Sequence, residues 1–139
     1  MTCALVTVPP EQLAAVWPRL RDSIISIEQP DGWLPEDVYC AVKMGGASLY
    51  LVMVNDIEVG FLVLRALQDF DGPRLHIWIL HAYSDADVMA EFSDKLDDLA
   101  RQIKATRITF GTTRRGWEKV APRYHFSVRE TIWQREIAS

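Results

Sequence analysis

The sequence predicts one α/β domain over residues 1–139, in which a mixed β-sheet carries helices on both faces. Two observations support this prediction. Apolar residues recur at three- and four-residue intervals in some segments, and alternate or run together in others, in the order β-α-α-β-β-β-α-β-α-β. Hydrophobic residues make up 49% of the chain and charged residues 24%, which is typical of a folded globular protein. Because no repeat or linker interrupts this order, we expect a single domain.

The N-terminal part is expected to form a strand and two helices. Residues 2–8 are rich in β-branched types and end at a pair of prolines. From Glu11 onward, apolar residues share one helical face. They are Leu13, Val16, Trp17, Leu20, Ile24 and Ile27. A second helix is expected from Pro35 to about Met44, because a proline suits the first helical turn and two glycines follow.

Three strands should follow as a meander. Residues 47–54 and 57–67 are strand-like and are separated by Asn55 and Asp56, which tolerate the positive φ of a tight turn. These two strands are expected to pair antiparallel. After a second turn, residues 74–83 are almost continuously apolar, which predicts a central strand covered on both faces.

The last third begins with the clearest helix pattern, over residues 86–104. Its apolar stripe consists of Val88, Met89, Phe92, Leu96, Leu99, Ala100 and Ile103. We expect a strand over residues 107–113 and a short helix over residues 116–125, interrupted at Pro122 because proline lacks the backbone N–H donor. A closing strand is predicted over residues 126–137.

This order of elements resembles the fold of the GNAT N-acyltransferases over nearly the whole chain. Three segments carry the resemblance: the hairpin "NDIEVGFLVL" (residues 55–64), the strand-to-helix junction at residues 81–88, and "GWEKVAPRYHFSV" (residues 116–128). The resemblance implies a single-domain GNAT-like mixed sheet. It also implies transfer of an acyl group from acyl-CoA, such as acetyl-CoA, to an acceptor amine.

The resemblance places the cofactor at the junction between the central strand and the long helix. In the family, the pyrophosphate rests on backbone N–H groups of a glycine-containing loop at this helix start, where the helix dipole favours an anion. Here the junction contains no glycine, and Asp85 and Asp87 are expected as helix-start residues, because Ser84 or Asp85 can cap free N–H groups and acids in the first turn complement the dipole. Their carboxylates oppose a diphosphate, so we expect a degenerate cofactor loop. The implied cofactor-binding residues here are His81, Ala82, Tyr83, Asp87, Val88 and Met89.

Two residues are candidates for proton transfer. His81, at the end of the central strand, is a candidate general base because its pKa lies near neutrality, and the alternative is a structural histidine with ordinary hydrogen bonds. The family often protonates the leaving thiolate with a tyrosine of the late helix, but that position falls on Ala121. Tyr124 could substitute only in another register, and is otherwise a partly buried aromatic residue. His125 replaces the family's glycine, which predicts a different helix exit.

Arg114 and Arg115 form the most basic turn of the chain. Arginine forks can bind the 3′-phosphate of CoA, an acidic peptide or a nucleic-acid backbone. They can also pair with acidic residues on the exposed face of the long helix. If they bind the 3′-phosphate of CoA, both arginines are cofactor-binding residues.

Composition narrows the functional classes. The net charge of −4 argues against nucleic acid as a partner and against anionic membranes. No metal site is expected, because Cys3 and Cys40 lack zinc-ligand spacing, and His76 and His81 should point to opposite faces of one strand. Without a signal peptide or membrane-spanning segment, we expect a cytoplasmic protein. If the chain is an acyltransferase, its partner is an acceptor amine. If it is a non-catalytic binding or assembly module, its partner is another protein or a second copy of the chain.

Overall fold

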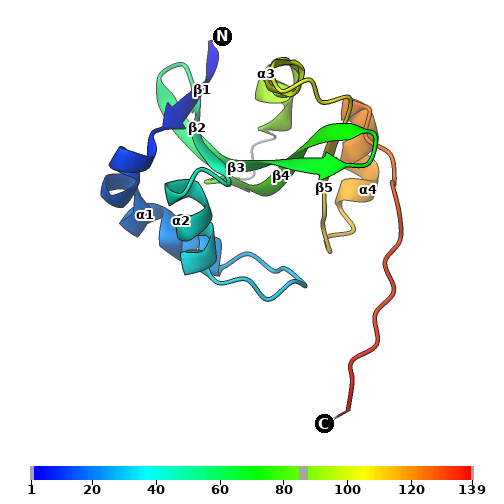
Figure 1. Cartoon of the computed structure of the whole chain (residues 1–139). Coiled ribbons are helices and arrows are strands. Elements are labelled where there is room, and N and C mark those ends of the chain that lie inside the picture. Colours follow the sequence, from blue (N-terminus) through cyan, green and yellow to red (C-terminus); the bar gives the residue numbers. More distant parts are fainter. Residues whose placement is uncertain (1, 85–87, 139) are drawn as a thin grey trace.

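The computed structural model describes residues 2–84 and 88–138, and in this part of the chain a five-stranded mixed sheet forms the centre (Figure 1). The strands are β1 (Cys3–Val8), β2 (Ser48–Val54), β3 (Ile57–Asp69), β4 (Gly72–Ala82) and β5 (Ile108–Phe110). They lie in the order of their numbers. The first four pair antiparallel, whereas β5 is parallel to β4. The predicted α/β class and its mixed sheet are confirmed.

Helices cover both faces of the sheet, as predicted (Figure 1). The helical segments are η1 (Pro10–Gln12), α1 (Leu13–Ile25), α2 (Pro35–Lys43), α3 (Met89–Gln102), α4 (Trp117–Val120) and η2 (Ala121–Tyr124). Side chains alternate along β3, so Phe61 enters the core beneath α1 and α2 while Leu62 enters the core beneath α3. Each face of the sheet therefore has its own hydrophobic core, which we name the α1/α2 core and the α3 core.

The hairpin between β2 and β3 turns as the sequence predicts. Asn55 and Asp56 both have positive φ, at 53° and 63°. Two consecutive positive φ angles match the right-handed twist of the flanking strands. The predicted antiparallel pairing of these strands is confirmed.

The late helix ends as a helix terminated by glycine does, although His125 stands at that position. The α-helical turns stop at Val120 and continue as the 3₁₀ segment η2, which contains Pro122. His125 then adopts φ 68°, and its N–H and that of Phe126 donate to the carbonyl oxygens of Pro122 and Ala121, both at 3.1 Å. These bonds form the closing motif usually made with glycine at this position. The predicted change of helix exit at His125 is therefore wrong.

A β-bulge interrupts the pairing of β3 with β4. Val63 lies opposite Ile79, but the next residue, Leu64, lies opposite Ile77. Trp78 is thus an additional residue on β4 without a partner on β3. One extra residue breaks the two-residue alternation of side chains along the strand.

The bulge places two histidines on the same face of the sheet. Before it, Leu75 packs in the α3 core, so its neighbour His76 faces the α1/α2 side. After it, Ile79 packs in the α1/α2 core, and His81 lies opposite Phe61 of the same core. The predicted opposite orientation of His76 and His81 is wrong. Residues five positions apart on a regular strand point to opposite faces, but the extra residue at the bulge turns His81 to the same face as His76.

The predicted closing strand is also wrong. Residues 126–138 pair with no strand in the described structure, and beyond Arg129 they extend away from the sheet as a tail (Figure 1). The strand-like composition of this segment is real, but a strand needs a partner for its backbone groups. Its expected neighbour, β5, has only three residues.

Candidate functional site

The strands β4 and β5 separate soon after they meet. They pair only where residues 75–77 lie beside residues 108–110, whereas β4 continues to Ala82. From Trp78 to Ala82, no described strand occupies the β5 side of β4. This open edge presents backbone donors and acceptors, to which an extended ligand with amide groups can bind as an added strand would.

His81 lies on this open segment, with its ring among aromatic side chains. The ring centroid is 5.4 Å from that of Phe61 and 6.0 Å from that of Tyr83. Partial burial lowers the pKa of His81, and the positive charge of Arg114 lowers it further. The imidazole is therefore neutral at neutral pH, which is the form that can accept a proton.

A cluster of three polar side chains stands beside His81. Glu58 on β3 accepts hydrogen bonds from Arg19 of α1 and from the hydroxyl of Tyr83. Burial acts to raise the pKa of Glu58, but these two hydrogen bonds outweigh it and hold the pKa below its ordinary value. Burial and the bond to Glu58 raise the pKa of Tyr83. The cluster fixes the strand end that carries His81.

Sequence reasoning missed this cluster. Arg19 and Glu58 are 39 residues apart, and nothing in the local pattern around either residue indicates the other. Tyr83 was expected only as part of the cofactor junction. Its backbone N–H donates to the carbonyl oxygen of Val59 at 3.0 Å, so its main chain is already engaged with β3.

The basic turn lies near His81 but not against the acidic helix. Arg114 acts on the pKa of His81, and its backbone N–H donates to Oγ1 of Thr112 at 3.0 Å. Among the described residues, neither Arg114 nor Arg115 forms an ion pair with α3, where Asp98 pairs with Arg101 instead. Arg114 is thus within electrostatic reach of His81, and the described residues do not contain the predicted pairing with the acidic helix face.

Tyr124 lies apart from His81. It packs against the α3 core, next to aromatic residues that contact one another: the rings of Phe110 and Trp117 are 4.9 Å apart, and those of Phe110 and Phe126 are 5.0 Å apart. His81 faces the α1/α2 side, whereas Tyr124 packs on the side of α3. The roles of both residues in proton transfer stay predictions.

The remaining cofactor candidates surround the start of α3. Val88 and Met89 are buried in the α3 core, and Ala82 packs against the same core. Their side chains therefore anchor the start of the helix, and their role in cofactor binding stays a prediction. Asp87, like Asp85, lies outside the described residues.

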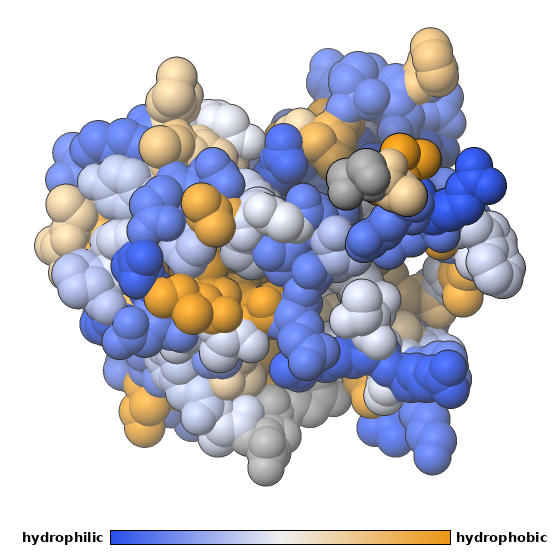
Figure 2. All heavy atoms as spheres, turned by 90° about the horizontal axis from the view of Figure 1, so that it is seen from below, coloured by the Kyte–Doolittle hydropathy of each residue, from blue (hydrophilic) through white to orange (hydrophobic). Residues whose placement is uncertain are grey.

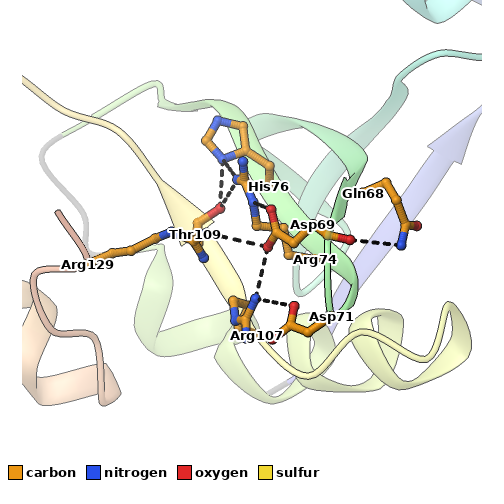
Figure 3. Close-up of polar contacts among 8 residues, drawn as sticks. All are labelled: Gln68, Asp69, Asp71, Arg74, His76, Arg107, Thr109 and Arg129. Carbon is orange, nitrogen blue, oxygen red and sulfur yellow. Dashed lines mark hydrogen bonds and ion pairs between the residues drawn. The ribbon is translucent and has the colours of Figure 1, made fainter. Parts of the chain in front are cut away.

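A second polar cluster occupies the end of β4 that is opposite to His81. Figure 3 shows its contacts. Asp69 accepts a hydrogen bond from Arg74 at 3.0 Å and one from Arg107 at 2.9 Å, and Arg129 of the tail reaches it at 3.5 Å. Arg74 also donates to Oγ1 of Thr109 at 2.7 Å. These contacts tie the β3–β4 turn to β5 and to the tail.

Thr109 also holds His76, which belongs to this cluster. Nδ1 of His76 and Oγ1 of Thr109 are 2.8 Å apart. Burial lowers the pKa of His76, and the positive charges of Arg74 and Arg65 lower it further. His76 and His81 thus share a face of the sheet but have separate partners. No group of residues that could hold a metal ion occurs in the described part of the chain.

No protein-family model matches the chain, and no curated protein is detectably similar to it in sequence. Solved structures do match. A ribosomal-protein-alanine N-acetyltransferase from Brucella melitensis biovar Abortus 2308 superposes with a TM-score of 0.70 at 12% identity, over 99% of this chain and 100% of that one. The chain has the GNAT fold.

Two further structures agree with this assignment. An acetyltransferase from Trypanosoma brucei matches with a TM-score of 0.66 at 12% identity, covering 98% of this chain and 100% of that one. An aminoglycoside acetyltransferase from an uncultured soil metagenomic sample, solved with sisomicin, gives 0.66 at 10% identity, covering 99% and 96%. The GNAT fold is thus present over essentially the full length. No helix in the described part of the chain is long and apolar enough to cross a membrane.

Proposed function

We propose that the chain is an N-acyltransferase that moves an acyl group from acyl-CoA to an amine. The observation that carries this proposal is the open edge of β4 from Trp78 to Ala82, with His81 on it, in a chain of GNAT fold. The pantetheine arm of CoA is extended and contains two amides. Such an arm can pair with a free strand edge in the way that a peptide does.

The residues around the open edge suit the pantetheine arm of CoA better than its diphosphate. The open edge suits the pantetheine arm, and Arg114 and Arg115 offer positive charge for phosphate. In the segment that precedes α3, where the diphosphate would lie, the sequence contains the carboxylates of Asp85 and Asp87 and no glycine. We therefore expect CoA to bind weakly, held mainly through its arm. When bound, it supplies the acyl group as a reactive thioester.

His81 is the proposed base for the acceptor amine. A base must be unprotonated before the reaction, and the lowered pKa of His81 meets this requirement at neutral pH. Because His81 faces the α1/α2 side, the amine would approach from that side, next to Phe61 and Tyr83. The hydrogen bond from Tyr83 to Glu58 would hold the strand end in place during the reaction.

Titration calorimetry with acetyl-CoA tests the proposal directly. We expect saturable binding by the wild-type chain and by His81→Ala, because His81 acts on the amine rather than on the CoA arm. Only the wild-type chain should then transfer the acyl group to a primary amine. An absence of heat and of a thermal shift at millimolar acetyl-CoA would reject the enzyme.

The second candidate function is a non-catalytic binding or assembly module. The sequence of the junction favours it, because residues 84–89 contain two carboxylates, those of Asp85 and Asp87, and no glycine. The same titration separates the two functions, since a module of this kind needs no acyl-CoA.

A further inference from the structure

The C-terminal tail, residues 126–138, exposes large apolar side chains without a partner. Val128, Ile132, Trp133 and Ile137 are each 80–89% exposed. Single exposed apolar residues are common on protein surfaces, but four of them within ten residues of an extended segment are not. On the side toward which the tail projects, hydrophobic residues of the body also form a band surrounded by hydrophilic ones (Figure 2).

The base of the tail is fixed to the body at two points. The ring of Phe126 contacts that of Phe110 on β5, with centroids 5.0 Å apart. Three residues later, Arg129 reaches Asp69 at 3.5 Å with its long side chain (Figure 3). Beyond Arg129 the tail leads away from the sheet (Figure 1). These two contacts set the direction in which the rest of the tail leaves its own domain.

An open cavity of about 1850 Å³ lies between the tail and β5. Its lining contains β5 with its flanking residues, parts of β4, α3 and α4, and the chain's own tail as far as Gln134. The outer edge of β5 faces no described strand, because β5 is the last strand of the sheet. An unpaired strand edge readily accepts an extended segment from another chain.

We propose that the cavity beside β5 receives the tail segment Glu130–Ile137 of a second copy of this chain. The segment has the β-branched and aromatic content of a strand, and its eight residues can extend about 26 Å beyond its own domain. Each copy offers both an open β5 edge and a projecting segment. A reciprocal exchange about a two-fold axis satisfies both, and it buries Ile132 and Trp133.

Cross-linking between two different single-cysteine chains tests the exchange. In a background of Cys3→Ala and Cys40→Ser, one chain carries Gly111→Cys, in the cavity, and the other carries Ile132→Cys, in the tail. After the two chains are mixed, a short bismaleimide should join them covalently, which no intrachain contact can do. Glu11→Cys, which lies beyond β1 at the opposite edge of the sheet, replaces Gly111→Cys as the control and should give no such product.

Light scattering gives an independent readout. The full chain should be a dimer, and the chain ending at Phe126 a monomer with an unchanged circular dichroism spectrum. If truncation impairs folding, Trp133→Asp in the full chain should raise the dimer dissociation constant more than about tenfold, since this side chain is exposed in the monomer. A full chain that remains monomeric, whether its tail closes on its own β5 or binds an unrelated peptide, would overturn the proposal.

Discussion

Gly60 on β3 lies directly against the carbonyl oxygen of His81 on β4. A Cβ atom added to Gly60 would overlap this oxygen, and would also lie 3.2 Å from Cα of Ala82. Both neighbours are backbone atoms, which cannot rotate away as the end of a side chain can. The absence of a side chain at residue 60 therefore allows β3 to approach β4 at the residue that we propose as the base.

We predict that Gly60→Ala destabilises the protein by about 1–3 kcal/mol, because the added methyl group forces the two strands apart. Chemical denaturation measures this change, and acetyl-CoA binding should weaken in parallel. Gly111→Ala is the matched control, because a Cβ atom there has no neighbour within 4 Å. Equal stability of the two variants would contradict the predicted collision.

The pH dependence of acyl transfer should report His81. Since burial and Arg114 lower the pKa of His81, kcat/KM should rise with pH around a midpoint below the ordinary histidine value of about 6.5. Arg114→Gln removes a positive charge and should move the midpoint upward, whereas Arg114→Lys should not. An NMR titration of the His81 ring checks the same shift without catalysis. A midpoint above the ordinary value would refute the assignment.

Acid should destabilise the protein through His76. The pKa of His76 is lowered in the folded state, so the unfolded chain takes up its proton first as the pH falls. The free energy of unfolding should therefore decrease below about pH 6.5, the ordinary histidine pKa. His76→Gln should flatten this dependence, as measured by urea denaturation across the range. An unchanged slope would show that His76 has the same proton affinity in both states.

Asp69→Asn should loosen the end of the sheet from which the tail departs. The carboxylate of Asp69 binds Arg74, Arg107 and Arg129, so its loss weakens contacts to β4, to β5 and to the tail together. Faster amide exchange in β5 and a lower melting temperature are expected. The control is Asp98→Asn, which breaks one exposed pair and should change stability by less than about 0.5 kcal/mol. Identical exchange in both variants would be evidence against a shared role of Asp69.

His125→Gly should stabilise the protein by about 1 kcal/mol. The φ of 68° at His125 lies in the left-handed region, which costs a residue with a Cβ atom about that much. Glu118→Gly provides the contrast, because it places glycine inside α4 and should be destabilising. Denaturant midpoints of the two variants should move in opposite directions. A loss of stability in His125→Gly would indicate that the imidazole makes contacts that outweigh the backbone strain.

Much of the fold follows from local patterns. The apolar stripes predict α1 and α3 because a helix brings every third or fourth residue to one side. Asn55 and Asp56 predict the hairpin because their side chains tolerate positive φ. The prediction of a closing strand was wrong because a strand also needs a neighbouring strand. Composition describes what a segment can form, but not whether such a partner is present.

The sequence by itself determined the order of the elements as far as the late helix and the two covered faces of the sheet, because each depends on residues close together in the chain. Only the tertiary structure decided which side chains meet around His81. The bulge at Trp78 turned His76 and His81 to one side, and packing joined Glu58 to Arg19 across 39 residues. Such relationships depend on strand register and on how helices pack on the sheet, and neither quantity is encoded within a short stretch of residues.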